Sequence, residues 1–249
     1  IIQASGTDGT VVFGDVVDTG SGTIAVNSGA LATADIIVQF PSGRSFSSAG
    51  AITTATTDTG ELHFLGGSQL VDSAVGASSK PLKLIQVSGT GDTTFNGPVY
   101  ATTTTIDEAS TVVMAASQLL TSNVHFTTSG AGGALIINTG NFTGNVTTAN
   151  TGRGTVSTAG AATFTGTMGA SGAIIAMVDI NHTAGITGSV YATEVDIDVA
   201  TLSMSAGADI TGNVDFSADG VLALANGADV TGTILPSGGD GMGTVNVAG

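Results

Sequence analysis

Three acidic residues alternate with apolar ones in a single short segment, Glu194-Val195-Asp196-Ile197-Asp198-Val199. In a β-strand, alternate residues share a face, so Glu194, Asp196 and Asp198 are expected on one face and the apolar residues on the other. Three carboxylates on one face repel each other unless a cation binds, and Ca²⁺ favours such oxygen ligands. The segment predicts either a Ca²⁺ site, to which a neighbouring strand would add Asp215, or a solvated acidic face.

Residues suited to acid–base catalysis are few and scattered. The histidines, His63, His125 and His182, lie far apart in the sequence, and Lys80 and Lys83 flank a proline where we expect a solvated loop. A glycosidase needs two carboxylates at a set separation, usually beside aromatic residues on which the sugar packs. In this chain Trp is absent and Tyr occurs twice. We therefore predict no catalytic residues and no enzyme activity. An enzyme that acts on glycans is the weaker alternative.

The charge balance excludes several classes of partner. Nineteen acidic residues face four basic ones, which gives a formal net charge of −15 in 249 residues. So few Lys and Arg residues argue against binding to nucleic acid, whose phosphates require them, and against anionic membrane surfaces. No apolar run reaches the roughly 18 residues of a transmembrane helix, so we expect no membrane insertion. Cysteine is absent, which excludes disulfides and thiolate metal sites.

The composition favours β-structure in an exported protein. Hydrophobic residues reach 41% and the chain has 38 glycines, with Thr, Ser, Ala and Val supplying most of the rest. Thr, Ser, Val and Gly are poor helix formers, whereas β-formers with frequent glycine turns are typical of all-β proteins. We expect an extracellular location at a cell surface. The N-terminal residues carry no signal-peptide pattern, so we expect a processed product or a fragment of a longer protein.

A five-residue motif recurs along the chain: an apolar residue, Thr, Gly, any residue, and a second apolar residue. Five copies are intact and three upstream copies are degenerate. Their first apolar residues are spaced by 20 to 25 positions and are Val71, Phe95, Leu120, Phe142, Phe164, Ile186, Ile210 and Val230. Regular spacing of this kind is the signature of a solenoid.

Within each repeat, the period-2 pattern separates an inner from an outer face. Ile210, Val214 and Phe216 are expected inside, and Thr211 and Asp215 outside. An upstream pair such as Leu202 and Met204 predicts a second strand, joined to the motif by a glycine turn. Stacked like residues favour a parallel β-helix with coils of about 20–25 residues over an array of antiparallel hairpins. The motif glycines are expected at a corner, where a Cβ would crowd the bend.

The regularity of the pattern divides the chain in two. Residues 61–249 are expected to form regular solenoid repeats. Residues 1–60 follow the spacing poorly and are expected to form an irregular N-terminal β segment, or coils with longer loops. Thr23–Val26 and Asp35–Phe40 are the clear strands there.

The repeats resemble a known group of proteins. The Thr-Gly-Asn-Val units, the Val-Tyr-Ala-Thr segments (residues 99–102 and 190–193) and the Gly-Ala-Asp-Val-Thr-Gly run (residues 227–232) look like the passenger repeats of bacterial autotransporter surface antigens, such as the outer membrane proteins A and B of rickettsiae. They are also similar in style to surface-layer proteins. The resemblance covers roughly residues 60–249. It implies export, a β-helical passenger, and a role in adhesion or in a protein coat.

These observations lead to one expected function with one alternative. We expect a structural component of a bacterial cell surface that associates with itself, laterally or end to end, into a layer, coat or fibre. The alternative is an adhesin stalk that binds a cell-surface glycan or a host protein. Ca²⁺ is the one cofactor that the sequence suggests.

Overall fold

The computed structural model describes residues 2–3, 9–14, 20–27, 36–44, 46–47, 50–107, 109–127, 132–239 and 241–248. Every regular element in these residues is a β-strand. None of them forms a helix with the length and hydropathy needed to cross a membrane. Much of the segment 1–60, which we predicted to be irregular, lies outside the described residues.

The strands form two long sheets and a short one. Sheet 1 has 13 strands. In order of hydrogen-bonded neighbours they are β2 (Gly9–Val12), β4 (Ile36–Pro41), β6 (Thr59–Leu65), β8 (Leu82–Ser88), β10 (Val99–Ile106), β12 (Gln118–Phe126), β14 (Gly140–Thr143), β17 (Ala162–Thr165), β19 (Ala184–Ile186), β21 (Thr201–Met204), β23 (Val221–Leu224) and β26 (Thr244–Val247), with β15 (Val146–Thr148) also paired to β12.

Sheet 2 has ten strands and sheet 3 has three. In sheet 2 the order is β7 (Gln69–Val71), β9 (Thr90–Phe95), β11 (Ala109–Met114), β13 (Ala134–Ile137), β16 (Arg153–Thr158), β18 (Ile175–Ile180), β20 (Val190–Ile197), β22 (Ile210–Asp215) and β24 (Val230–Thr231), with β25 (Ile234–Leu235) also paired to β22. Sheet 3 contains β1 (Ile2–Gln3), β3 (Ile24–Asn27) and β5 (Ile52–Thr53).

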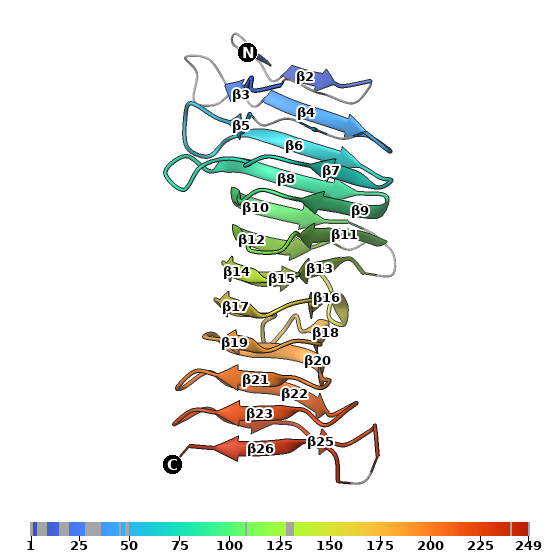
Figure 1. Cartoon of the computed structure of the whole chain (residues 1–249), viewed down its shortest axis with the longest axis vertical. Coiled ribbons are helices and arrows are strands. Elements are labelled where there is room, and N and C mark those ends of the chain that lie inside the picture. Colours follow the sequence, from blue (N-terminus) through green and yellow to red (C-terminus); the bar gives the residue numbers. More distant parts are fainter. Residues whose placement is uncertain are drawn as a thin grey trace.

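All paired strands among the described residues run parallel, and most of them pair with one strand of the preceding coil and one of the following coil. The chain therefore winds as a β-solenoid of about nine turns, with the coils stacked along the long axis and the two termini at opposite ends (Figure 1). This confirms the predicted all-β parallel solenoid.

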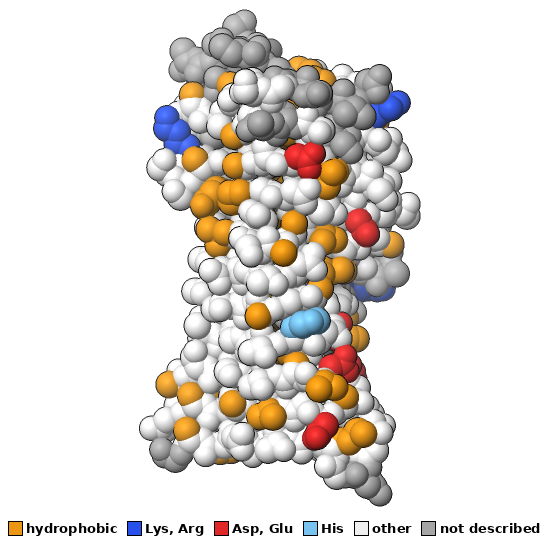
Figure 2. Space-filling view, in the orientation of Figure 1, with side chains coloured by type: hydrophobic (Ala, Val, Ile, Leu, Met, Phe, Trp, Pro, Cys, Tyr) orange, Lys and Arg blue, Asp and Glu red, His pale blue; other side chains and the backbone are white. Residues whose placement is uncertain are grey.

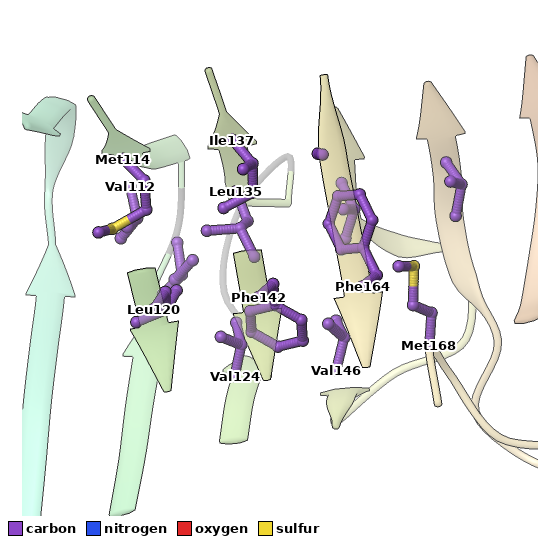
Figure 3. Close-up of a cluster of buried hydrophobic side chains, with 14 of the residues drawn as sticks. Val112, Met114, Leu120, Val124, Leu135, Ile137, Phe142, Val146, Phe164 and Met168 are labelled. Carbon is purple, nitrogen blue, oxygen red and sulfur yellow. The ribbon is translucent and has the colours of Figure 1, made fainter. Parts of the chain in front are cut away.

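The interior is a set of apolar ladders that run along the axis. Phe142 pairs in register with Phe164 of the next coil, and Val146 pairs with Met168; all four side chains belong to the buried cluster in Figure 3. Phe40 stacks on Phe64 at a centroid distance of 5.1 Å. The inward residues are almost fully buried, as the alternating pattern predicted, and each stabilises the fold by roughly 1.5–3 kcal/mol.

The motif glycines lie at a corner of the coil, as predicted. A Cβ at Gly144, Gly166 or Gly232 would overlap a backbone carbonyl oxygen of the preceding coil. These glycines also have positive φ angles, for example 124° at Gly166, a region that other residues rarely adopt.

Side chains complete the hydrogen bonding at these corners. The backbone N–H of Asn145 donates to Asn123 Oδ1 at 3.0 Å, and the N–H of Thr167 donates to Asn145 Oδ1 at 2.9 Å. The variable residue of the motif therefore caps the next coil at the point where the bend interrupts the backbone ladder.

The stacking inferred from the motif spacing is wrong at two steps. Phe95 pairs with Met114 rather than with Leu120, and Leu120 pairs with Val99, the second apolar residue of the preceding motif. The two apolar positions are four residues apart and both point inward, so alternation alone cannot tell which one continues a ladder. The second step has the same form, with the pairs Ile186–Met204 and Val190–Ile210.

These two steps belong to a longer repeat of four coils. In the first unit, the four coils start at the stacked residues Ile52, Val75, Val99 and Leu120. In the second unit, they start at Val146, Met168, Val190 and Ile210. Strands β10 and β20 occupy equivalent places, have the same alternation of buried and exposed residues, and carry the same register shift. The turns before β8 and β18, one coil earlier, also match, with the bridges Ala77–Lys80 and Ala170–Ala173.

The second unit is rotated about the axis relative to the first. Leu120, the last of the first unit's row, stacks on Phe142, whereas the second unit's row begins four residues later, at Val146. Equivalent outward positions of the two units therefore lie on different sheets. His125 in sheet 1 corresponds to Asp215 in sheet 2.

Candidate functional site: the acidic row of sheet 2

Three aspartates from successive coils form a row on the outer surface of sheet 2. Asp196 on β20 pairs in register with Asp179 on β18 and with Asp215 on β22. Neighbouring strands lie about 4.8 Å apart, whereas alternate residues of one strand are about 6.6 Å apart. The parallel stacking therefore brings carboxylates from different coils closer together than those of the Glu194–Asp198 segment.

The predicted ligands share an outward face but not one row. Glu194 pairs with Met177 and Asn213 rather than with other acids. Val195 and Ile197 are buried as predicted, whereas Val199, which we expected on the same inner face, is 78% exposed because β20 ends at Ile197.

Two aspartates of the row are well supplied with donors. Asp179 Oδ2 accepts hydrogen bonds from Ser157 Oγ at 2.9 Å and from Asn181 Nδ2 at 2.7 Å. Asp215 accepts hydrogen bonds from the backbone N–H and the hydroxyl of Ser237. Outside the row, the hydroxyl of Ser217 donates to Asp198.

Asp196, at the centre of the row, is poorly satisfied by comparison. Its Oδ1 is buried and has no hydrogen-bond partner among the described residues. Burial raises the pKa of Asp196, and the charges of Asp198, Asp179 and Asp215 raise it further, while a hydrogen bond from Ser217 opposes the shift. The ionised form is therefore disfavoured here, which a proton or a cation would relieve.

No group of three or more His, Asp or Glu side chains within the described residues is arranged to hold a metal ion. Ca²⁺ binding by Glu194, Asp196 and Asp198 stays a prediction. The cross-coil neighbour Asp215 was named from sequence, but Asp179 was not, because finding it requires the register of β18 on β20.

A second charged cluster lies on the outer face of sheet 1. Glu61 Oε2 is 3.0 Å from His63 Nε2, and Glu61 Oε1 is 3.0 Å from Lys83 Nζ. The hydrogen bond with His63 is the main cause that lowers the pKa of Glu61, with Lys83 adding to it against the effect of burial. Lys83 was expected in a loop beside Pro81, but it lies in β8.

The remaining histidines lie on other coils, away from this cluster. His125 Nδ1 is 2.9 Å from Thr147 Oγ1 of the next coil, and His182 follows β18 in a turn. An open groove of about 600 Å³ crosses the corner between sheets 2 and 1 near β14, β17 and β19, and small uncharged residues line it.

The charged residues are unevenly distributed along the rod. After Arg153 the sequence contains no Lys or Arg, and Figure 2 shows acidic side chains over the lower right of the visible face, towards the C-terminal coils. The coils that follow Arg153 are thus anionic, with no Lys or Arg to compensate their charge.

Comparisons with known proteins add no relative to this picture. No family model matches the chain, and no match was found among curated proteins or solved structures.

Proposed function

We propose that the protein is a structural component of a bacterial cell surface, in which copies associate with one another into a layer, coat or fibre. The observation that supports this is the unbroken parallel stacking from β2 to β26. A solenoid of this kind is a stiff rod whose stability sums over neighbouring coils, which suits a mechanical role.

The distribution of charge favours lateral contact through one face. The outward residues of β14, β17, β19 and β21 are small and uncharged, and one row consists of Asn141, Thr163, Gly185 and Ser203. Because the chain carries a net charge of −15, copies approach each other with least repulsion where no charge is exposed.

The acidic row gives assembly a way to respond to cations. Ca²⁺ bound at Asp196 and its neighbours would reduce the repulsion between the C-terminal units of adjacent copies. Assembly is therefore expected to increase with Ca²⁺ and to reverse with a chelator.

Electron microscopy of the native cell surface tests the proposal directly, because a regular lattice or fibre labelled by an antibody to this chain is the expected result. Sedimentation of the purified chain with Ca²⁺ or a chelator tests the role of the acidic row. The double variant Asp196→Asn, Asp215→Asn is compared with Asp92→Asn, an exposed aspartate of β9. A chain that remains monomeric under all conditions, and forms no ordered array on cells, would contradict the proposal.

The second candidate function is an adhesin whose solenoid presents binding positions to another cell. It is favoured by the two outward tyrosines, Tyr100 and Tyr191, which occupy equivalent places in the two four-coil units. Scattered labelling at points of contact between cells, without a lattice, would favour this function over a structural layer.

A further inference from the structure

The two tyrosines of the chain occupy the same place in the two four-coil units. Tyr100 pairs with Thr121 immediately before the register shift of β10, and Tyr191 pairs with Thr211 immediately before that of β20. Both tyrosines are partly exposed. Register shifts of this kind redirect side chains and often lie beside functional sites.

A shallow pocket lies at this register shift, and its lining includes Ala101 and Thr102, the two residues that follow Tyr100. Its volume is about 280 Å³, and its polar lining comes from Thr102, Thr121, Ser122, Asn123 and Thr143. Thr102 and Thr143 are exposed, so their hydroxyl groups are available to a ligand.

The lining of this pocket recurs almost unchanged in the second unit. Six residues have identical counterparts: Ala101, Thr102, Thr121, Asn123, Thr143 and Gly144 correspond to Ala192, Thr193, Thr211, Asn213, Thr231 and Gly232. Only Ser122 differs, and its counterpart is Gly212.

The scaffold around the pocket has not been kept in this way. The stretch Leu82–Val87 of β8 and its counterpart Ile175–Ile180 in β18 have the same burial pattern but share no identical residue. The recurring five-residue motif already accounts for Thr121, Thr143 and Gly144 and their counterparts. It does not account for Tyr100, Ala101 and Thr102, which follow the motif and have identical counterparts in the second unit.

Some of the shared residues have a structural reason. A Cβ at Gly144 or Gly232 would overlap the preceding coil. Asn123 and Asn213 accept backbone N–H groups of the next coil, at 3.0 and 3.2 Å. These reasons do not extend to the tyrosines or to Thr102 and Thr193, which are exposed.

The chemistry of these residues fits a sugar. A tyrosine ring offers an apolar face with a polar tip, and below Tyr100 the row continues with Thr121, Thr143 and Thr165. The hydroxyl groups of this row repeat at about 4.8 Å along the axis, close to the rise of an extended pyranose chain. The net charge of −15 disfavours an anionic polysaccharide.

We propose that each of these two places binds a neutral linear glycan, with the sugar chain parallel to the solenoid axis. We call them the tyrosine sites. Each consists of the tyrosine together with the threonines and the asparagine that line the pocket at Tyr100, or their counterparts at Tyr191. One sugar ring packs on Tyr100 or Tyr191, and the threonine hydroxyls and the asparagine amide exchange hydrogen bonds with the neighbouring ring. The two tyrosine sites are four coils apart, about 19 Å along the rod, and make the chain bivalent.

The chain reports on its own binding, because it has two tyrosines and no tryptophan. The experiment titrates the whole chain with hexamers of β-1,4-linked glucose and of β-1,4-linked N-acetylglucosamine, followed by tyrosine fluorescence and calorimetry. The expected result is saturable binding of at least one hexamer at two equivalent sites.

Variants assign the sites. Tyr100→Ala and Tyr191→Ala should each remove one of the two sites and leave the dissociation constant of the other unchanged. The double variant should weaken binding by about tenfold or more. Tyr→Phe at both places should retain binding. Thr163→Ala should also retain it, because Thr163 is an outward residue of β17 that lies outside both tyrosine sites.

Circular dichroism and thermal melting check that each variant is folded. The double variant Thr102→Val, Thr193→Val provides a second test of the sites and leaves both tyrosines in place. It should weaken binding at both sites while the melting temperature stays unchanged. Absence of saturable binding of both hexamers at millimolar concentration would overturn the proposal. So would binding that the double tyrosine variant leaves unaltered.

Discussion

Phe142 lies one coil above Phe164, with the ring centroids 6.0 Å apart and the ring planes tilted by 48°. Both side chains are almost fully buried, and the ladder continues to Ile186 on the next coil. Residues of one ladder therefore support the coils on either side. The loss of one ring should weaken both contacts, because a rigid solenoid cannot collapse around the gap.

Phe164→Ala should destabilise the chain by about 3–5 kcal/mol, the usual range for the removal of a buried ring. Urea unfolding followed by far-UV circular dichroism measures the change. The neighbouring Thr163→Ala, on the outer face of the same strand, should change stability by only about 0.5 kcal/mol. Similar effects for the two variants would contradict the inward ladder.

The corner glycines can be tested with a matched pair. At Gly166, φ is 124° and a Cβ would overlap the carbonyl oxygen of Gly144, whereas Gly172 has an ordinary φ and no neighbour near the Cβ position. Gly166→Ala should destabilise the chain by roughly 2 kcal/mol or more, from backbone strain and steric overlap. Gly172→Ala should be neutral or slightly stabilising. Equal melting temperatures for the two variants would show that the corner tolerates a side chain.

The alternating pattern was enough to predict the inner face of the strands, although not the exposure of Val199, which lies past the end of β20. Leu202 and Met204 are buried, as are Ile210 and Val214, because side-chain parity is a local property of a strand. The corner glycines were predictable for a similar reason, since an aligned glycine marks a place where a Cβ does not fit.

The stacking of coils was harder to predict than the faces. Both apolar positions of the motif point inward, so Leu120 could have continued the row of Phe95 or that of Val99, and it continues the latter. The choice depends on the length of the connector and on the register shift of β10, which have no clear signal in the sequence. Asp179 was missed for the same reason, because its place beside Asp196 follows from the register and not from spacing along the chain.

The cluster around Glu61 should make stability depend on pH in one direction. Its pKa is lowered in the folded chain relative to the ordinary value of 4.5. The ionised carboxylate therefore contributes stability that is present above about pH 4.5 and is lost as the pH falls through the folded pKa.

Glu61→Gln should destabilise the chain by about 0.5–1 kcal/mol at pH 7, a modest value because the Lys83 side chain is 43% exposed. The difference from the wild type should vanish as the pH falls through the lowered pKa of Glu61. Thermal unfolding measured between pH 3 and pH 7 provides the check, with Asp92→Asn as the charge-matched control. A difference that is constant over this range would exclude the ion pair as its cause.

The acidic row should respond to pH with the opposite sign. The pKa of Asp196 is raised in the folded chain, so the folded state binds the proton more tightly than the unfolded state. This contribution favours folding at low pH and is lost as the pH rises through the folded pKa. At neutral pH the ionised Asp196 therefore opposes folding, although solvent screening limits the effect to about 1 kcal/mol or less.

Asp196→Asn should accordingly raise the melting temperature at pH 7 in the presence of a chelator, and the gain should disappear on acidification. If Ca²⁺ binds at the row, millimolar Ca²⁺ should stabilise the wild type but not this variant, because the amide removes the central charge. Calorimetry at pH 7 with Ca²⁺ or a chelator separates the two effects. If the wild type melts at the same temperature with Ca²⁺ and with the chelator, Ca²⁺ does not bind at the acidic row. If Asp196→Asn destabilises the chain, the fold needs the carboxylate in its ionised form.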